Sequence, residues 1–214
     1  MRATRGGRLF LVALGLLVAC RRPVEEPKHE LTGTWLREPE LAQGFDLRPD
    51  GSLGLLGMSD RSGLAWSASH GELMLSTNAA EHVESTAARL RVAALTAEVL
   101  ELEGKDEPLA GRYRRGDAAI VRGILTYRER LALPADAHVV VELAQVGVGT
   151  IALHAFQARH PVPIGFELSV IPLVETRYEV TARIVDHERT LFVTPKPVPA
   201  TPDGDTLEIL LQRP

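Results

Sequence analysis

The chain has 214 residues, with 24 Lys and Arg against 28 Asp and Glu, which gives a formal net charge of −4. This acidic balance, without a block of basic residues, argues against nucleic-acid binding and against electrostatic docking on anionic lipid. The single cysteine, Cys20, excludes an intrachain disulfide and a cysteine-ligated metal centre. The length fits one large domain or two small ones.

The first twenty residues have the parts of a bacterial export signal. An apolar run over residues 9–19 follows three arginines: Arg2, Arg5 and Arg8. The run is too short for a transmembrane helix, so we expect residues 1–19 to be removed as a signal peptide. The segment Leu17-Val18-Ala19-Cys20 resembles the lipobox of bacterial lipoproteins, in which cleavage between Ala19 and Cys20 leaves a lipidated cysteine. We prefer this interpretation over a buried thiol at the end of an apolar helix.

Residues 20–30 are expected to form a tether. The segment has two prolines, many charges and one aliphatic residue, so it cannot bury enough apolar surface to order itself. Loss of the signal peptide leaves 21 basic against 28 acidic residues, a net charge of −7, so the acyl chains on Cys20 would hold the protein on the membrane. Arg21, rather than Asp, after the cysteine resembles the sorting pattern of lipoproteins that reach the outer membrane. We therefore expect a lipid-anchored, periplasm-facing protein of the outer membrane.

Residues 31–115 predict a first domain of short antiparallel strands. Alternating apolar and polar residues are separated by turn signals, of which Asp50-Gly51 is the strongest. Residues 86–102 also contain good helix formers, but a period of two places Leu90 and Val92 on one face and Arg89 on the other, which favours strands. The expected strands cover 31–36, 45–48, 53–56, 64–69, 72–77, 86–95, 100–103 and 109–115.

This half resembles the small lipocalin-like domains of bacterial lipoproteins. The resemblance rests on Gly33-Thr34-Trp35, Gly44-Phe45, Trp66 and residues 109–113. It implies that Gly33 and Trp35 close the floor of a barrel and that an arginine of the last strand, Arg112 or Arg114, covers the indole. The span is small for eight strands, so we expect a narrow interior in which both tryptophans belong to the core rather than to a ligand site.

Residues 119–214 predict a second domain, joined to the first by a linker of three residues, 116–118. Seven alternating segments indicate an immunoglobulin-like β-sandwich, with Tyr178 as a corner tyrosine whose hydroxyl ties a loop. The predicted fold class is therefore all-β, a small lipocalin-like antiparallel barrel followed by an immunoglobulin-like sandwich. The expected strands lie within 125–133, 139–143, 151–158, 164–170, 178–184, 191–193 and 207–211.

The second half also resembles the YscW/YbaY family of bacterial lipoproteins. The residues that carry this resemblance are 123–130 with Leu133-Pro134, then 163–168, Arg177-Tyr178, 182–184 and Leu191-Phe192. One branch of the family comprises pilotins, lipoproteins that carry a secretin subunit to the outer membrane. The resemblance implies binding of an envelope protein, with a secretin as one candidate partner.

Nothing in the sequence predicts an enzyme, a cofactor or a metal site. The seven histidines are scattered, and Ser59 lacks the second glycine of a nucleophile elbow. Glu129 is interpreted as the partner of Arg128 or Arg130 in an ion pair rather than as a catalytic acid.

Two functions are consistent with these patterns. The first is a protein-binding, chaperone-like lipoprotein, and the alternative is a carrier of a small apolar ligand in the first domain. For the first, the expected surface combines residues 123–133 with 163–168, and the expected partner contacts are Tyr127, Arg128, Arg130 and Phe166.

Overall fold

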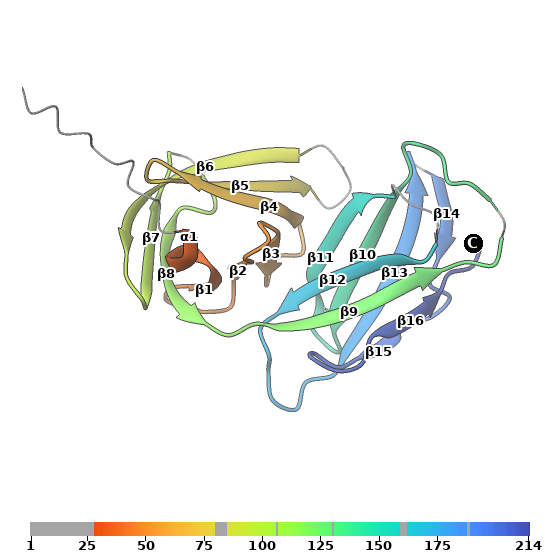
Figure 1. The fold of residues 1–214 in the computed structure, drawn as a ribbon. Coiled ribbons are helices and arrows are strands. Elements are labelled where there is room, and N and C mark those ends of the chain that lie inside the picture. The colour runs from red at the N-terminus through yellow and green to blue at the C-terminus, as the bar shows by residue number, and fades with distance from the viewer. Residues whose placement is uncertain (1–27, 80–84, 106, 130, 159–161, 188) are drawn as a thin grey trace, which may run out of the picture.

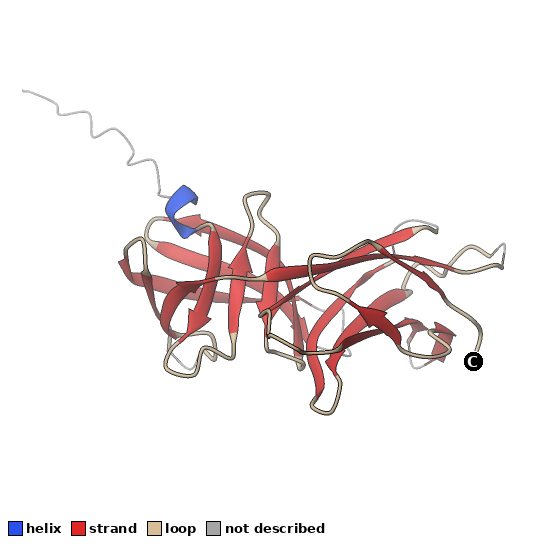
Figure 2. Cartoon of the chain, turned by 90° about the horizontal axis from the view of Figure 1, so that it is seen from below, coloured by secondary structure: helices blue, strands red, loops and turns tan. Residues whose placement is uncertain are grey.

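The computed structural model describes residues 28–79, 85–105, 107–129, 131–158, 162–187 and 189–214. The signal peptide, Cys20, Arg130 and His160 lie outside the described residues. Two strand-rich bodies stand side by side, and only a few residues separate the last strand of one from the first strand of the other (Figure 1). Apart from the one-turn helix α1, Lys28–Leu31, the regular structure of the described residues consists of strands (Figure 2).

The first body is an eight-stranded antiparallel sheet that curls into a nearly closed barrel. Its strand order is β3-β2-β1-β8-β7-β6-β5-β4. An antiparallel bridge between Ser52 and Ala65 brings the two ends of this order together. The strands are β1 Gly33–Arg37, β2 Gly44–Leu47, β3 Leu53–Leu56, β4 Arg61–Ser69, β5 Glu72–Ala79, β6 Ser85–Leu95, β7 Val99–Glu103 and β8 Gly111–Gly116. The prediction of strands over 86–102 is thus confirmed.

Inward-facing side chains fill the interior of the barrel. Trp35 is fully buried, and its Nε1 donates a hydrogen bond to the carbonyl of Leu31 at 2.7 Å. Phe45 and Tyr113 pack with ring centroids 4.7 Å apart. Both tryptophans belong to the core, as expected. The other core residues are Leu31, Leu47, Leu53, Leu55, Met58, Leu73, Leu75, Leu90, Leu100, Leu102 and Leu109.

The arginine that covers Trp35 is Arg115, so the prediction of Arg112 or Arg114 is wrong. The guanidinium carbon of Arg115 lies 3.9 Å from the centroid of the indole ring. Residues of a strand alternate between its two faces, and Tyr113 points into the core, so its neighbours Arg112 and Arg114 point outward. There both form ion pairs with Glu38: Nε of Arg112 lies 2.9 Å from Oε2, and Nε of Arg114 lies 3.2 Å from Oε1.

The second body is a sandwich of two sheets. The larger has the order β11-β10-β13-β14, with β15 paired to β13, and the smaller has the order β12-β9-β16. Most pairs are antiparallel, but β16 runs parallel to β9. The strands are β9 Ala119–Thr126, β10 His138–Gln145, β11 Gly149–Gln157, β12 Ile164–Val170, β13 Tyr178–Asp186, β14 Arg189–Val193, β15 Val198–Ala200 and β16 Leu207–Leu210. The predicted fold class is confirmed for both bodies.

Two details of the sandwich were predicted with different success. The amide of Leu173 donates a hydrogen bond to the hydroxyl of Tyr178 at 3.3 Å, so this tyrosine ties a loop as expected. The first strand does not continue to residue 133, because β9 ends at Thr126. Among the described residues, no helix is long and apolar enough to cross a membrane.

Candidate functional site

Two of the predicted partner contacts lie in the core of the sandwich. Inward positions alternate along β9, and Tyr127 continues this alternation past its end, so the ring stacks on Phe192 with centroids 4.4 Å apart. Tyr127 is 7% exposed and Phe166 is 4% exposed. A Cβ atom at Gly123 would lie 2.3 Å from the ring of Phe166, which shows how closely this ring packs on β9. The prediction that these two rings contact a partner is therefore wrong.

The charged residues of the same predicted surface have different positions. Arg128 is exposed, so it stays a predicted contact, and Arg130 lies outside the described residues. Glu129 has its Oε1 3.7 Å from Nε of Arg213, near the end of the chain. The described partner of Glu129 is therefore a residue distant in sequence, which neighbouring residues alone could not identify.

The barrel covers one edge of the sandwich, and the sequence did not predict this junction. The amide of Ala155 in β11 donates a hydrogen bond to Oγ of Ser62 at 3.1 Å, and its carbonyl accepts one from Nδ2 of Asn78 at 3.0 Å. Met58 forms a parallel bridge with Ala152 of the same strand. These contacts satisfy backbone groups that an edge strand would otherwise expose to other chains.

Apolar packing continues the junction behind this edge. Val140, Leu153 and Ala155 form a small buried cluster of their own. Val140 lies between Val139 and Val141, which face the main core of the sandwich, so β10 is buried on both faces. Three consecutive valines are the signal in the sequence for such a strand.

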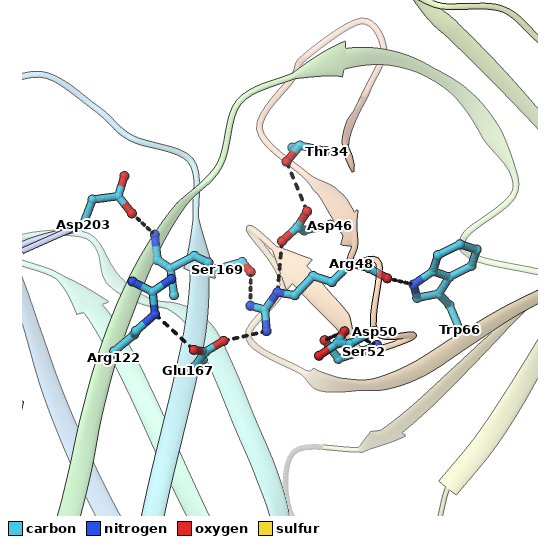
Figure 3. A network of polar contacts seen from close by, with 11 residues as sticks. Thr34, Asp46, Arg48, Asp50, Ser52, Trp66, Arg122, Glu167, Ser169 and Asp203 are labelled. Carbon is cyan, nitrogen blue, oxygen red and sulfur yellow. Dashed lines mark hydrogen bonds and ion pairs between the residues drawn. The ribbon is translucent and has the colours of Figure 1, made fainter. Parts of the chain in front are cut away.

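A network of ion pairs crosses the junction next to these contacts (Figure 3). Arg48 of the barrel binds Glu167 of β12 at 2.9 Å and donates to Oγ of Ser169 at 2.9 Å. Its Nε also lies 3.2 Å from Asp46, and Arg122 binds the other oxygen of Glu167 at 3.0 Å. Two cations thus balance two carboxylates, which suits a structural contact between the two bodies better than the capture of a charged ligand.

His154 is the unusual group at this junction. Burial lowers its pKa to about 4, and the charge of Arg48 acts in the same direction, whereas the backbone of Glu167 opposes the shift. Its Nδ1 is buried and has no hydrogen-bond partner among the described residues. The cavity that His154 lines measures about 60 Å³, too little for a ligand of several heavy atoms. We interpret the junction as a structural joint.

An open groove lies at the end of the sandwich away from the barrel, next to the C-terminus marked in Figure 1. It measures about 490 Å³ and runs along β14, whose outer edge pairs at Val193 with Gln212. Leu131 is 46% exposed at its rim, and Phe192, which stacks on Tyr127, lines it from below. The lining residues are Leu131, Ala132, Pro134, Asp186, Arg189, Thr190, Leu191, Phe192, Arg213 and Pro214.

The chemistry of this groove fits a segment of another protein. Apolar side chains form part of its lining, together with Arg189, Arg213 and Asp186, and Arg213 already pairs with Glu129. Such a groove accepts the apolar face of a helix or strand, whose polar groups can then contact the charged residues of the lining. We call this surface the distal groove.

Comparison with known proteins finds one family model and two solved structures that resemble parts of this chain. Residues 117–211 match the family model described as "Type III secretion system lipoprotein chaperone (YscW)". A solved structure of an alternative pilotin from the type II secretion system of Vibrio cholerae is 27% identical over 44% of this chain and 96% of that protein, with a TM-score of 0.41. A crystal structure of a lipocalin-like protein from Bacteroides thetaiotaomicron VPI-5482 is 19% identical over 41% of this chain and 97% of that protein, with a TM-score of 0.35. No curated protein matches the chain.

The family match confirms the predicted resemblance of the second half to YscW-type lipoproteins. It covers the whole sandwich, from the linker to the last residue before Gln212, and leaves the barrel outside. The match associates this half with chaperone lipoproteins of bacterial secretion systems, which are proteins of the cell envelope that bind a partner.

Proposed function

We propose that this chain is a lipoprotein of the outer membrane that binds a secretin-like protein as a chaperone and catalyses no reaction. The observation that carries the proposal is the match of residues 117–211 to the family of type III secretion lipoprotein chaperones. Cys20, alkylated by diacylglycerol before the signal peptide is cleaved between Ala19 and Cys20, is the proposed anchor. The barrel is a rigid addition that the ion pairs and hydrogen bonds of the junction hold on the β11 edge.

The distal groove is the proposed binding surface. The junction with the barrel occupies the β11 edge, so this edge cannot pair with a partner. The rings of Tyr127 and Phe166 lie in the core, so they cannot contact a partner either. The groove stays open, has exposed apolar residues and lies far from the junction. Tyr127 contributes indirectly, because it supports Phe192 under the groove. We propose that an amphipathic segment of the partner binds here through its apolar face.

Substitutions in the groove test this proposal. Leu131→Asp places a charge at the exposed apolar rim of the groove, and we expect it to reduce the amount of secretin that co-purifies with the detergent-extracted lipoprotein at least tenfold. Val174→Asp is the matched control, because Val174 is 92% exposed and lies in the loop between β12 and β13, outside the groove. Equal capture by Leu131→Asp and the wild-type chain would contradict the groove as the binding surface.

A further inference from the structure

A second groove lies at the end of the barrel that α1 covers. It measures about 340 Å³, and its lining is mostly apolar, with Leu31, Ala68, Val92, Ala94 and Leu95 among the residues that form it. The barrel interior below is filled with side chains, so this groove is a surface feature and does not open into a central cavity. Pockets that hold small ligands begin at about 300 Å³, which places this groove at the lower end of that range.

Small residues and a β-bulge create the groove. The register between β6 and β7 shifts between Val92 and Ala94, and this irregularity bends the strand at this end of the barrel. Ala93 and Ala94 follow the bend with short side chains, and Gly71 turns the chain opposite them. The amide of Val92 donates a hydrogen bond to the carbonyl of Gly71 at 2.8 Å, which holds the two sides together.

The start of the described chain is fixed at this same end of the barrel. Arg115 donates hydrogen bonds to the carbonyls of Glu30, at 2.8 Å, and Thr32, at 2.6 Å. Leu31, between them, is buried and accepts the hydrogen bond of the Trp35 indole. Glu30 and Leu31 also line the groove, so the segment that leads to Cys20 departs from its border. Cys20 is eight residues before Lys28 and lies within about 29 Å of it even at full extension.

We propose that this groove binds one acyl chain of the lipid on Cys20 while the protein is outside the bilayer. The inference rests on the lipid anchor of the proposed function. A tether this short raises the effective concentration of the acyl chain at the groove to the millimolar range, so even weak binding fills it. In the absence of a membrane, the groove shields an apolar chain that would otherwise contact water or another protein.

The charges at the rim favour this occupant over a free fatty acid. Glu30 and Glu72 both line the groove, and both carry carboxylates at its border. Arg89 lies 3.7 Å from Glu72 but is well exposed, so it offsets this charge only in part. An ester- or amide-linked acyl chain is neutral and avoids the repulsion that the carboxylate of a free fatty acid would meet here.

Titration of the mature chain, residues 20–214, with a neutral acyl probe tests the proposal. The probe is monodecanoylglycerol, and isothermal titration calorimetry measures its affinity. Because Cys20 is the sole cysteine, N-decylmaleimide attaches one ten-carbon chain there and nowhere else. We expect the unmodified chain to bind the probe and the decylated chain to bind it at least tenfold more weakly. Decanoate should bind the unmodified chain more weakly than the neutral probe does.

Tryptophan substitutions locate the binding. Ala94→Trp and the more exposed Ala93→Trp should each reduce probe affinity at least tenfold, whereas Ala87→Trp, exposed on the same strand outside the groove, should leave it unchanged. Failure of the unmodified chain to bind, or equal binding by the decylated chain, would overturn the proposal. If Cys20 is not lipidated, palmitate does not label the protein in cells. That result would contradict the proposed anchor, and it would leave the titration of the groove unaffected.

Discussion

Acidification should destabilise this protein through His154. The pKa of this imidazole is about 4 in the folded chain, against 6.5 for the unfolded chain, because burial disfavours the charged form. The unfolded chain therefore binds the proton first as the pH falls, so stability decreases from about pH 6.5 downward and this contribution levels off below about pH 4. The difference between these two pKa values corresponds to at most about 3–4 kcal/mol of unfolding free energy. The nearest charged groups, Arg48 and Glu167, belong to the junction that the protonated imidazole would disturb.

Urea unfolding at pH 7 and pH 4.5 measures this effect. The free energy of unfolding of the wild-type chain should fall by about 2–3 kcal/mol more than that of His154→Phe, in which an apolar ring replaces the imidazole beside Phe156. His70→Asn, an exposed turn position with a positive φ of 53°, should retain the wild-type dependence on pH. Carboxylates titrate in all three proteins and cancel in the comparison. If the free energy of unfolding falls equally between pH 7 and pH 4.5 in the wild-type chain and in His154→Phe, then His154 does not cause the loss of stability.

Three further predictions concern the anchor and the floor of the barrel. Cys20→Ser should abolish labelling by radioactive palmitate in cells, and a labelled mutant would contradict the anchor. Trp35→Ala should cost about 3–5 kcal/mol in chemical denaturation, because it leaves a large cavity in the barrel core, and an unchanged midpoint would mean that the indole is not a core residue. Arg115→Ala should cost about 2 kcal/mol through the lost ring contact and the loss of three hydrogen bonds, to the carbonyls of Glu30, Thr32 and Ala97, whereas Arg112→Ala, in an exposed ion pair, should cost less than about 1 kcal/mol. Equal losses of unfolding free energy for the two substitutions would show that Arg115 does not hold residues 30–32 in place.

Local patterns predicted much of this fold because each depends on neighbouring residues. Period-two alternation identified β6 despite its helix formers, and the interpretation of Trp35 as a core residue is confirmed. The covering arginine was expected to be Arg112 or Arg114 and is Arg115, because the sequence does not state which face of β8 closes over the indole.

Contacts between distant segments could not be predicted in this way. The junction joins Ser62 and Asn78 to Ala155, more than seventy residues apart in each case, and no periodicity within one segment reports such a pair. The assignment of Tyr127 and Phe166 to a surface is wrong for a different reason. Both continue the inward alternation of their strands, so the local pattern itself indicated burial, whereas the assignment followed the two segments as a whole.

The most direct test of the proposed chaperone function measures the fraction of a secretin that reaches the outer membrane. Membranes are separated by density from cells that contain the wild-type lipoprotein, no lipoprotein, or the Leu131→Asp form. We expect the amount of secretin in the outer-membrane fraction to fall severalfold in cells without the lipoprotein and to fall similarly with Leu131→Asp. Val174→Asp should support the wild-type amount. An unchanged distribution of the secretin in cells that lack the lipoprotein would contradict the proposed chaperone function.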